Sequence, residues 1–165
     1  MKYCQDTTET HPLSLAHPHF VEDIHAIAMA EGYSRAPVIF ENAERALNLD
    51  KVKEPIYNAL GQDLPRSMDM TIGLKSDDTL HRQMLLVEFK LKVKIPTNVD
   101  GKDLIEKVNQ SVKMLGETLP IREEYIFIFH SDIKEEARSR FSRRFTKIPR
   151  TYIVMDMETF KATYF

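Results

Sequence analysis

Residues 67–94 read SMDMTIGLKSDDTLHRQMLLVEFKLKVK, and this stretch predicts a β-hairpin around which the rest of the chain is arranged. In its first half Met, Ile and Leu alternate with Asp, Thr and Gly. In its second half apolar residues alternate with a set that ends in Glu and Lys. Alternation of period two is typical of strands that bury one face. We therefore expect two half-buried antiparallel strands joined by a short loop.

The length of the loop decides which side chains of the hairpin face one another. With residues 76–79 as a four-residue loop, Asp69 falls opposite Leu86. Glu88 is then the diagonal neighbour of Asp69 on the same face, about 7 Å away between Cα atoms. Lys90 continues the alternation, so the two acids and this lysine are expected on one face. A register slip of one residue would separate them.

Two carboxylates and an ammonium group on one face of a sheet suggest a site for a hard cation. Carboxylate oxygens suit Mg²⁺, which binds through one or two protein carboxylates and substrate phosphate. A lysine beside such an ion can orient or deprotonate a water molecule, or stabilise charge that develops on a phosphate. The alternative is a solvated surface pair of Glu88 and Lys90, with Asp69 and Arg82 paired in the same way.

The order of these residues and elements resembles a known family. Asp69 is followed by Glu88-Phe89-Lys90 at the end of an apolar strand, then by a predicted helix at about 103–117 and an apolar strand at 125–129. This order resembles the core of the PD-(D/E)XK nuclease superfamily, over about residues 42–130. The resemblance implies an α/β fold with a restriction-endonuclease-like core, in which helices flank a mixed central sheet of αβββαβ type.

The resemblance also implies an activity, that of an Mg²⁺- or Mn²⁺-dependent nuclease that hydrolyses phosphodiester bonds of DNA. Asp69, Glu88 and the Phe89 carbonyl would hold the metal ion, and Lys90 would act on the attacking water. The chain departs from the family in three respects: Met68 stands where many members have proline, the meander is one strand short, and the Q-x-x-x-Y pattern is incomplete after Gln110. Other members keep the scaffold without catalysis, so a protein- or nucleic-acid-binding module, for example a toxin-neutralising one, is the alternative.

Basic side chains elsewhere suggest contacts with a phosphate backbone. Lys92 and Lys94 would continue the row of Lys90, and Gln110 and Lys113, with Lys107, are expected near the exposed side of the helix at 102–119. A further helix, at 134–148, carries Arg140, Arg143 and Arg144 on its exposed side. Each of these groups has the simpler alternative of keeping the surface soluble.

The remaining segments give weaker expectations. Residues 1–17 are expected to form an irregular N-terminal arm, 20–31 and 54–61 helices, and 151–155 a strand at the sheet edge. The strong helix formers of 41–49 predict another helix, from which Glu41 or Glu44 is a candidate fourth acid of the metal site. His11, His17, His19 and His25 lack the spacing of a metal site, so we expect loop and cap histidines.

Composition sets broad limits on partners and location. The 165 residues suffice for a single domain with its own core, and a net charge of −2 argues against a generally basic nucleic-acid coat while allowing a local basic patch. A single cysteine, Cys4, excludes an intrachain disulfide. Without an apolar run of about 20 residues or a signal sequence, we expect a cytoplasmic protein without membrane contact. DNA is the expected partner, with a homodimer or a protein partner as further options.

Overall fold

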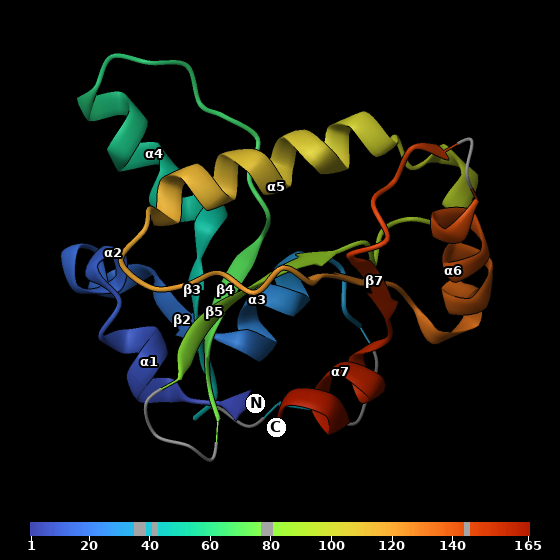
Figure 1. Ribbon diagram of the computed structural model, residues 1–165, viewed down its shortest axis with the longest axis horizontal. Helices are drawn as coiled ribbons and strands as arrows, with labels where there is room; N and C mark the ends of the chain where they lie inside the picture. Colours follow the sequence, from blue (N-terminus) through green and yellow to red (C-terminus); the bar gives the residue numbers. More distant parts are fainter. Residues whose placement is uncertain (35–38, 41–42, 77–80, 144–145) are drawn as a thin grey trace.

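The computed structural model describes residues 1–34, 39–40, 43–76, 81–143 and 146–165. Within them the chain forms an α/β structure in which helices flank an open, mixed sheet of seven strands (Figure 1). The strands are β1 (Lys2–Tyr3), β2 (Val21–Asp23), β3 (Arg45–Asn48), β4 (Met70–Lys75), β5 (Arg82–Phe89), β6 (Tyr125–Ile128) and β7 (Tyr152–Met155). The α-helices are α1 (Gln5–Glu9), α2 (Pro12–Ala16), α3 (Ile24–Ala30), α4 (Leu49–Ala59), α5 (Gly101–Leu115), α6 (Lys134–Ser142) and α7 (Met157–Tyr164). The 3-10 turns include Pro18–Phe20, Pro96–Asn98 and Ser131–Ile133.

The sheet has an antiparallel half and a parallel half that meet at β5. Strands β2, β3, β4 and β5 pair antiparallel in that order, whereas β5, β6 and β7 run parallel. Parallel neighbours need a crossover, and α5 and α6 supply the two that are required. The expected mixed sheet, the inner strand at 125–129 and the edge strand at 151–155 are therefore confirmed. Across the described residues, no helix is long and apolar enough to span a lipid bilayer.

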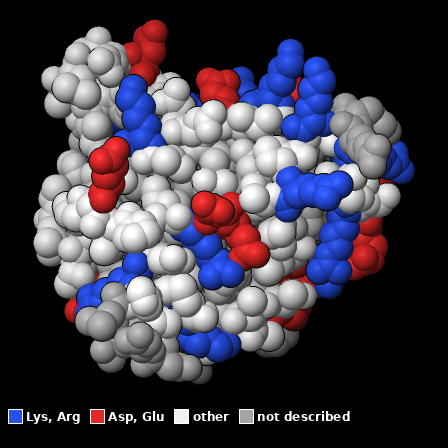
Figure 2. Space-filling model, in the orientation of Figure 1, with Lys and Arg blue, Asp and Glu red and all other residues white. Residues whose placement is uncertain are grey.

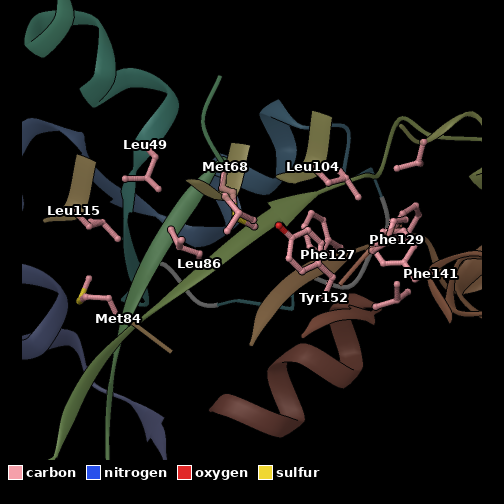
Figure 3. Packing of buried hydrophobic residues seen from close by; sticks show 14 of the residues in the cluster. Leu49, Met68, Met84, Leu86, Leu104, Leu115, Phe127, Phe129, Phe141 and Tyr152 are labelled. Carbon is pink, nitrogen blue, oxygen red and sulfur yellow. The ribbon is translucent and has the colours of Figure 1, made fainter. Parts of the chain in front are cut away.

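Helices cover both faces of this sheet. One buried cluster joins Met84, Leu86 and Phe127 to residues of α4, α5 and α6 (Figure 3). The second cluster lies on the other face, where Leu85 and Val87 pack with residues of α3 and α7. Both hairpin strands are consequently buried on both faces, so the expectation of half-buried strands is wrong. Burial on two faces makes an unpaired charge on β4 or β5 much more costly than one on an exposed sheet face.

The N-terminal segment is regular, in contrast to the irregular arm expected. Tyr3 of β1 pairs with Leu74 of β4, and the Tyr3 hydroxyl both accepts from the Arg45 N–H (2.8 Å) and donates to the Arg45 carbonyl (2.9 Å). Since β5 takes one edge of β4, β1 and β3 share its other edge, one after the other. The chain comes so close there that a Cβ on Gly73 would lie 2.5 Å from the Thr8 nitrogen.

The expectation of a helix at 41–49 is also wrong, because residues 45–48 form β3. Residues 41–42 lie outside the described residues. Ala46 and Leu47 are fully buried on opposite faces of the sheet, a gain in packing that outweighs their helix propensity. Strand β3 supplies the strand that the predicted meander lacked. It ends at Asn48, whose side chain caps α4 by accepting from the Lys51 N–H (3.1 Å).

The other helices begin or end a few residues away from the limits expected from the sequence. Residues 21–23 of the expected 20–31 helix form β2, and α4 starts before the expected 54–61 helix and runs through Pro55. The helix expected at 102–119 is confirmed as α5, with Asp100 as its cap. The helix expected at 134–148 is shorter, because α6 ends at Ser142, and a 3-10 turn precedes it at Ser131–Ile133.

Candidate metal centre

The hairpin register places Asp69 directly opposite Glu88. Lys75 pairs with Arg82 and Met70 with Val87, which is a shift of two residues from the expected pairing of Lys75 with Leu80. Leu80 itself lies outside the described residues. Because side chains alternate with period two, a shift by an even number keeps both acids on one face. The register, continued by one residue, therefore brings them closer together than the diagonal arrangement expected.

Asp69 lies just before β4 and is held by the main chain around it. Its side chain accepts a 2.6 Å hydrogen bond from the Phe89 N–H, and its carbonyl accepts one of 2.9 Å from the Leu49 N–H. The residue is only 4% exposed. Burial, and next the negative charge of Glu88, raise the pKa of Asp69 well above its usual range, against a smaller opposing effect of Lys107. A carboxyl group in this position is costly to ionise without a nearby cation.

Glu88 is more deeply buried, at 1% exposure, and holds two lysines. Lys90, just after β5, and Lys107, on α5, each donate a 2.6 Å hydrogen bond to the same oxygen, Oε1. Burial opposes the charge on Lys107, but Glu88, and to a smaller extent Asp69 and Asp50, outweigh it and raise the pKa of this lysine. Lys107 is therefore an ammonium group at neutral pH. The other oxygen of Glu88, Oε2, is buried without a hydrogen-bond partner among the described residues.

Two further acids complete the centre, and both are half-buried. Glu31 directly follows α3 as its C-cap, and Asp50 lies in the first turn of α4. One carboxylate oxygen from each of Glu31, Asp50 and Asp69 lies within 4.8 Å of the other two. Such a group of oxygens, which we call the acidic triad, can hold a metal ion, and hard cations such as Mg²⁺, Mn²⁺ and Ca²⁺ prefer these donors.

Each half-buried acid of the acidic triad also contacts a neighbouring donor. Asp50 accepts from the Ser67 hydroxyl (2.7 Å) and from Lys53 (2.6 Å), and Glu31 pairs with Lys92 at 3.2 Å. These contacts hold the two carboxylates toward Asp69 from separate elements. Because Lys53 and Lys92 are side chains with flexible stems, they can be displaced when another cation takes their place.

A groove opens beside Lys90. It has a volume of about 620 Å³, and its basic lining residues are Arg66, Lys90, Lys92 and Lys94. The expected row of lysines therefore lines a common groove, although it does so from a turn, because β5 ends at Phe89. Lys94 is exposed at the rim, whereas Arg66 is paired with Asp103 of α5. Lys90 and Lys92 both line the groove and also contact acids of the centre, Glu88 and Glu31 respectively.

The other predicted site residues lie as follows. Phe89 contacts Asp69 through its amide, and the metal contact of its carbonyl stays a prediction. On α5, Gln110 is half-buried and Lys113 exposed, whereas Lys107 points inward to Glu88, against the expectation for this lysine. Arg140 belongs to α6 and Arg143 follows it, while Arg144 lies outside the described residues. Lys and Arg gather toward the α6 side of the face seen in Figure 2, with acidic residues among them.

Neither Glu44 nor the histidines of the described segments join the centre. Glu44 pairs with Lys161 of α7, and Glu41 lies outside the described residues. Among the described residues, the group of potential ligands within reach of one ion contains no histidine. His11 instead caps α2, because its Nδ1 accepts from the Leu13 N–H (3.2 Å), which confirms the expectation of a cap histidine at this position.

Sequence reasoning missed Glu31 and Asp50, and it placed Lys107 on the wrong side of its helix. The two acids are distant from Asp69 in the chain, and only the folding of α3 and α4 brings them near it. Lys107 carried a usable signal: Asp103, Lys107 and Ser111 are spaced by four and lie beside the apolar stripe of α5. All three face the sheet region, since Ser111 accepts from the Met68 N–H (2.8 Å).

Comparison of the chain with protein-family models, with curated proteins and with solved structures gives no match, so the geometry of this centre is the basis for assigning a function.

Proposed function

We propose that the protein is a divalent-metal-dependent nuclease of the PD-(D/E)XK kind, which hydrolyses phosphodiester bonds of DNA. One observation carries the proposal: the buried carboxylate of Asp69 belongs to the acidic triad and also lies opposite Glu88, whose side chain holds Lys90 at 2.6 Å. The same site thus contains oxygen donors for a hard cation and an ammonium group that can act on a phosphate.

The residues of the centre fit a divalent cation. All the donors are oxygens, and the buried Oε2 of Glu88 has no hydrogen-bond partner among the described residues, as expected for an atom that meets a cation. Glu31, Asp50 and Asp69 would hold Mg²⁺ or Mn²⁺, whereas Glu88, which was also expected to hold the ion, is not in this group of potential ligands. An ion bound there polarises a phosphate oxygen and lowers the pKa of a bound water.

The side chains of the protein supply the rest of the reaction. Lys90 is 15% exposed and is oriented by Glu88, so it can hold the attacking water or the charge that develops on the phosphate. The groove continues from Lys90 toward Lys94, and its charge suits a phosphate backbone. The arginines of α6 offer further backbone contacts.

The order of elements also supports the proposal. Helix α3 is followed by the antiparallel strands β3, β4 and β5, then by α5 and the parallel strand β6. This is the αβββαβ order that the resemblance implies, apart from α4, which is inserted between β3 and β4.

Cleavage assays test the proposal directly. Single-stranded DNA, double-stranded DNA and RNA would each be incubated with Mg²⁺, Mn²⁺ or chelator, with the wild type, Asp69→Asn and the double variant Glu88→Ala, Lys90→Ala. We expect metal-dependent cleavage of DNA that falls by at least about 10²-fold in both variants. Asp156→Asn, which alters a buried acid paired with Lys134 outside the centre, is the matched control and should keep the activity.

Calorimetric titration with Mn²⁺ tests the metal separately from cleavage. Asp69→Asn should lose the binding that the wild type and Asp156→Asn show. No cleavage of any of the three polymers would contradict the nuclease proposal. The binding-module alternative, which requires no metal ion, would then take precedence, above all if Mn²⁺ did not bind either.

A further inference from the structure

Lys90 and Lys107 share one buried anion, although they come from different elements. Each ammonium nitrogen lies 2.6 Å from Oε1 of Glu88, so at most twice that distance separates the two nitrogens. We infer that Lys107 is a second substrate-binding cation, which contacts the phosphate at the reaction centre beside Lys90, with Glu88 as the common anchor of both. This inference rests on the proposed nuclease function and assigns a residue to it.

The positive charges around Glu88 exceed its negative charge, so a second anion can bind there. Glu88 carries one negative charge and holds two ammonium groups, so the pair keeps a positive surplus. This surplus of one positive charge faces whatever anion enters, and a phosphodiester carries the matching charge. The buried surroundings strengthen this attraction compared with a lysine pair in bulk water.

The hydrogen bonds of the two ammonium groups also support a phosphate contact. Each group has three N–H donors, and in the described part of the chain each donates one hydrogen bond, to Glu88. Their side chains are 15% and 19% exposed, so a ligand can reach the remaining donors. Two donors so close together suit the two non-bridging oxygens of one phosphodiester.

Helix α5 holds Lys107 in a fixed position. Ser111, one turn further on, accepts from the Met68 N–H (2.8 Å), and Asp103, one turn before, pairs with Arg66. Both contacts tie the Lys107 side of the helix to the segment that leads into β4 and Asp69. A cation mounted between two such anchors is preorganised, so little conformational entropy is lost when phosphate binds.

The first test measures binding of fluorescein-labelled DNA oligonucleotides, single-stranded and duplex, by fluorescence anisotropy in chelator. We expect Lys107→Met to weaken binding about tenfold and to lower the slope of log K against log salt by about 1, because one phosphate contact is lost. Lys107→Arg keeps the cation and should restore most of the affinity. Lys134→Met is the matched control, because Lys134 is equally buried, pairs with the buried Asp156, and lies outside the centre.

A second test introduces Lys107→Met into the Glu88→Gln variant, and it distinguishes phosphate binding by Lys107 from simple neutralisation of Glu88. If Lys107 only balances Glu88, its loss should have no effect on DNA binding once Glu88→Gln has removed that charge. If Lys107 contacts phosphate, Lys107→Met in the Glu88→Gln background should again weaken binding about tenfold and lower the salt slope by about 1. The double variant also leaves no uncompensated buried glutamate, which keeps the test usable if the single variant folds poorly.

The two proposals fail in different experiments. An unchanged salt slope in Lys107→Met, no loss in the Glu88→Gln background, or no binding of DNA by the wild type in chelator would each overturn the role of Lys107. A wild type that binds DNA through Lys107 but cleaves none of the polymers would overturn the nuclease proposal alone. If the nuclease function and the role of Lys107 are both correct, Lys107→Met should lower kcat at least tenfold in Mg²⁺, while Lys134→Met leaves kcat unchanged.

Discussion

The main-chain N–H of Phe89 donates a 2.6 Å hydrogen bond to Oδ2 of Asp69. This bond ties the end of β5 to the start of β4 and fixes a carboxylate that is 4% exposed. Burial and the nearby Glu88 raise the pKa of Asp69, so the fold keeps an acid that costs free energy when it ionises. Such a cost is common where a protein gives up stability for a functional site.

Asp69→Asn should therefore keep or increase stability in chelator. The asparagine oxygen can still accept from the Phe89 N–H, while the buried charge and its repulsion by Glu88 disappear. We expect the free energy of unfolding to stay the same or to rise by about 1 kcal/mol, the low end for relief of a buried charge. Urea unfolding checks this, and a loss of more than about 2 kcal/mol would mean that the carboxylate stabilises the fold.

Replacement of Asp156, in contrast to that of Asp69, is expected to lower the stability of the fold. Burial disfavours its charge, but hydrogen bonds from Lys134 and Thr159 outweigh this and lower the pKa of Asp156 to about 2. Since the folded pKa is lower than the unfolded one of about 3.9, the ionised group stabilises the fold above about pH 4, and this contribution is lost as the pH falls toward 2. Asp156→Asn should be less stable than the wild type near pH 7 and equal to it near pH 2. Urea midpoints across this range measure the difference, and a gap that stays constant with pH would contradict the expectation.

Gly73→Ala tests the close packing of the N-terminal segment on β4. The added Cβ would meet the main chain at Thr7 and Thr8, with the Thr8 nitrogen only 2.5 Å away, so backbone has to move. We expect a loss of about 1–3 kcal/mol in the free energy of unfolding, as for other overpacked sites. In a chain that lacks residues 1–9 the same substitution should cost much less. Equal losses in both chains would show that the contact with α1 is not the cause.

Sequence patterns predicted the parts of the fold in which local preference and tertiary packing agree. The 3.6-residue apolar stripe of α5 and the continuous apolar run of β6 are such cases. Strand β3 could not be predicted in this way, because its Arg, Ala and Leu favour a helix in isolation. Only its pairing with β2 and β4, and the burial of Ala46 and Leu47, make it a strand.

The candidate centre was predictable to the extent that it lies within one hairpin. Asp69 and Glu88 are brought together by β4 and β5, and an error of two residues in the register left them on one face. Glu31 and Asp50 arrive from other elements, so no local pattern relates them to Asp69. Lys107 was placed on the exposed side because a lysine on an amphipathic helix usually lies there, whereas a buried glutamate draws it inward.

The edge of β4 that β1 and β3 share has a consequence for the newly made chain. Residues Lys2 and Tyr3 are synthesised early but pair with Leu74 and Lys75, which follow much later. Until that pairing forms, part of this edge has no strand beside it, and open strand edges invite pairing with other molecules. In the folded protein Lys2 and Tyr3 cover that part of the edge, so less of β4 stays open to pairing with another chain.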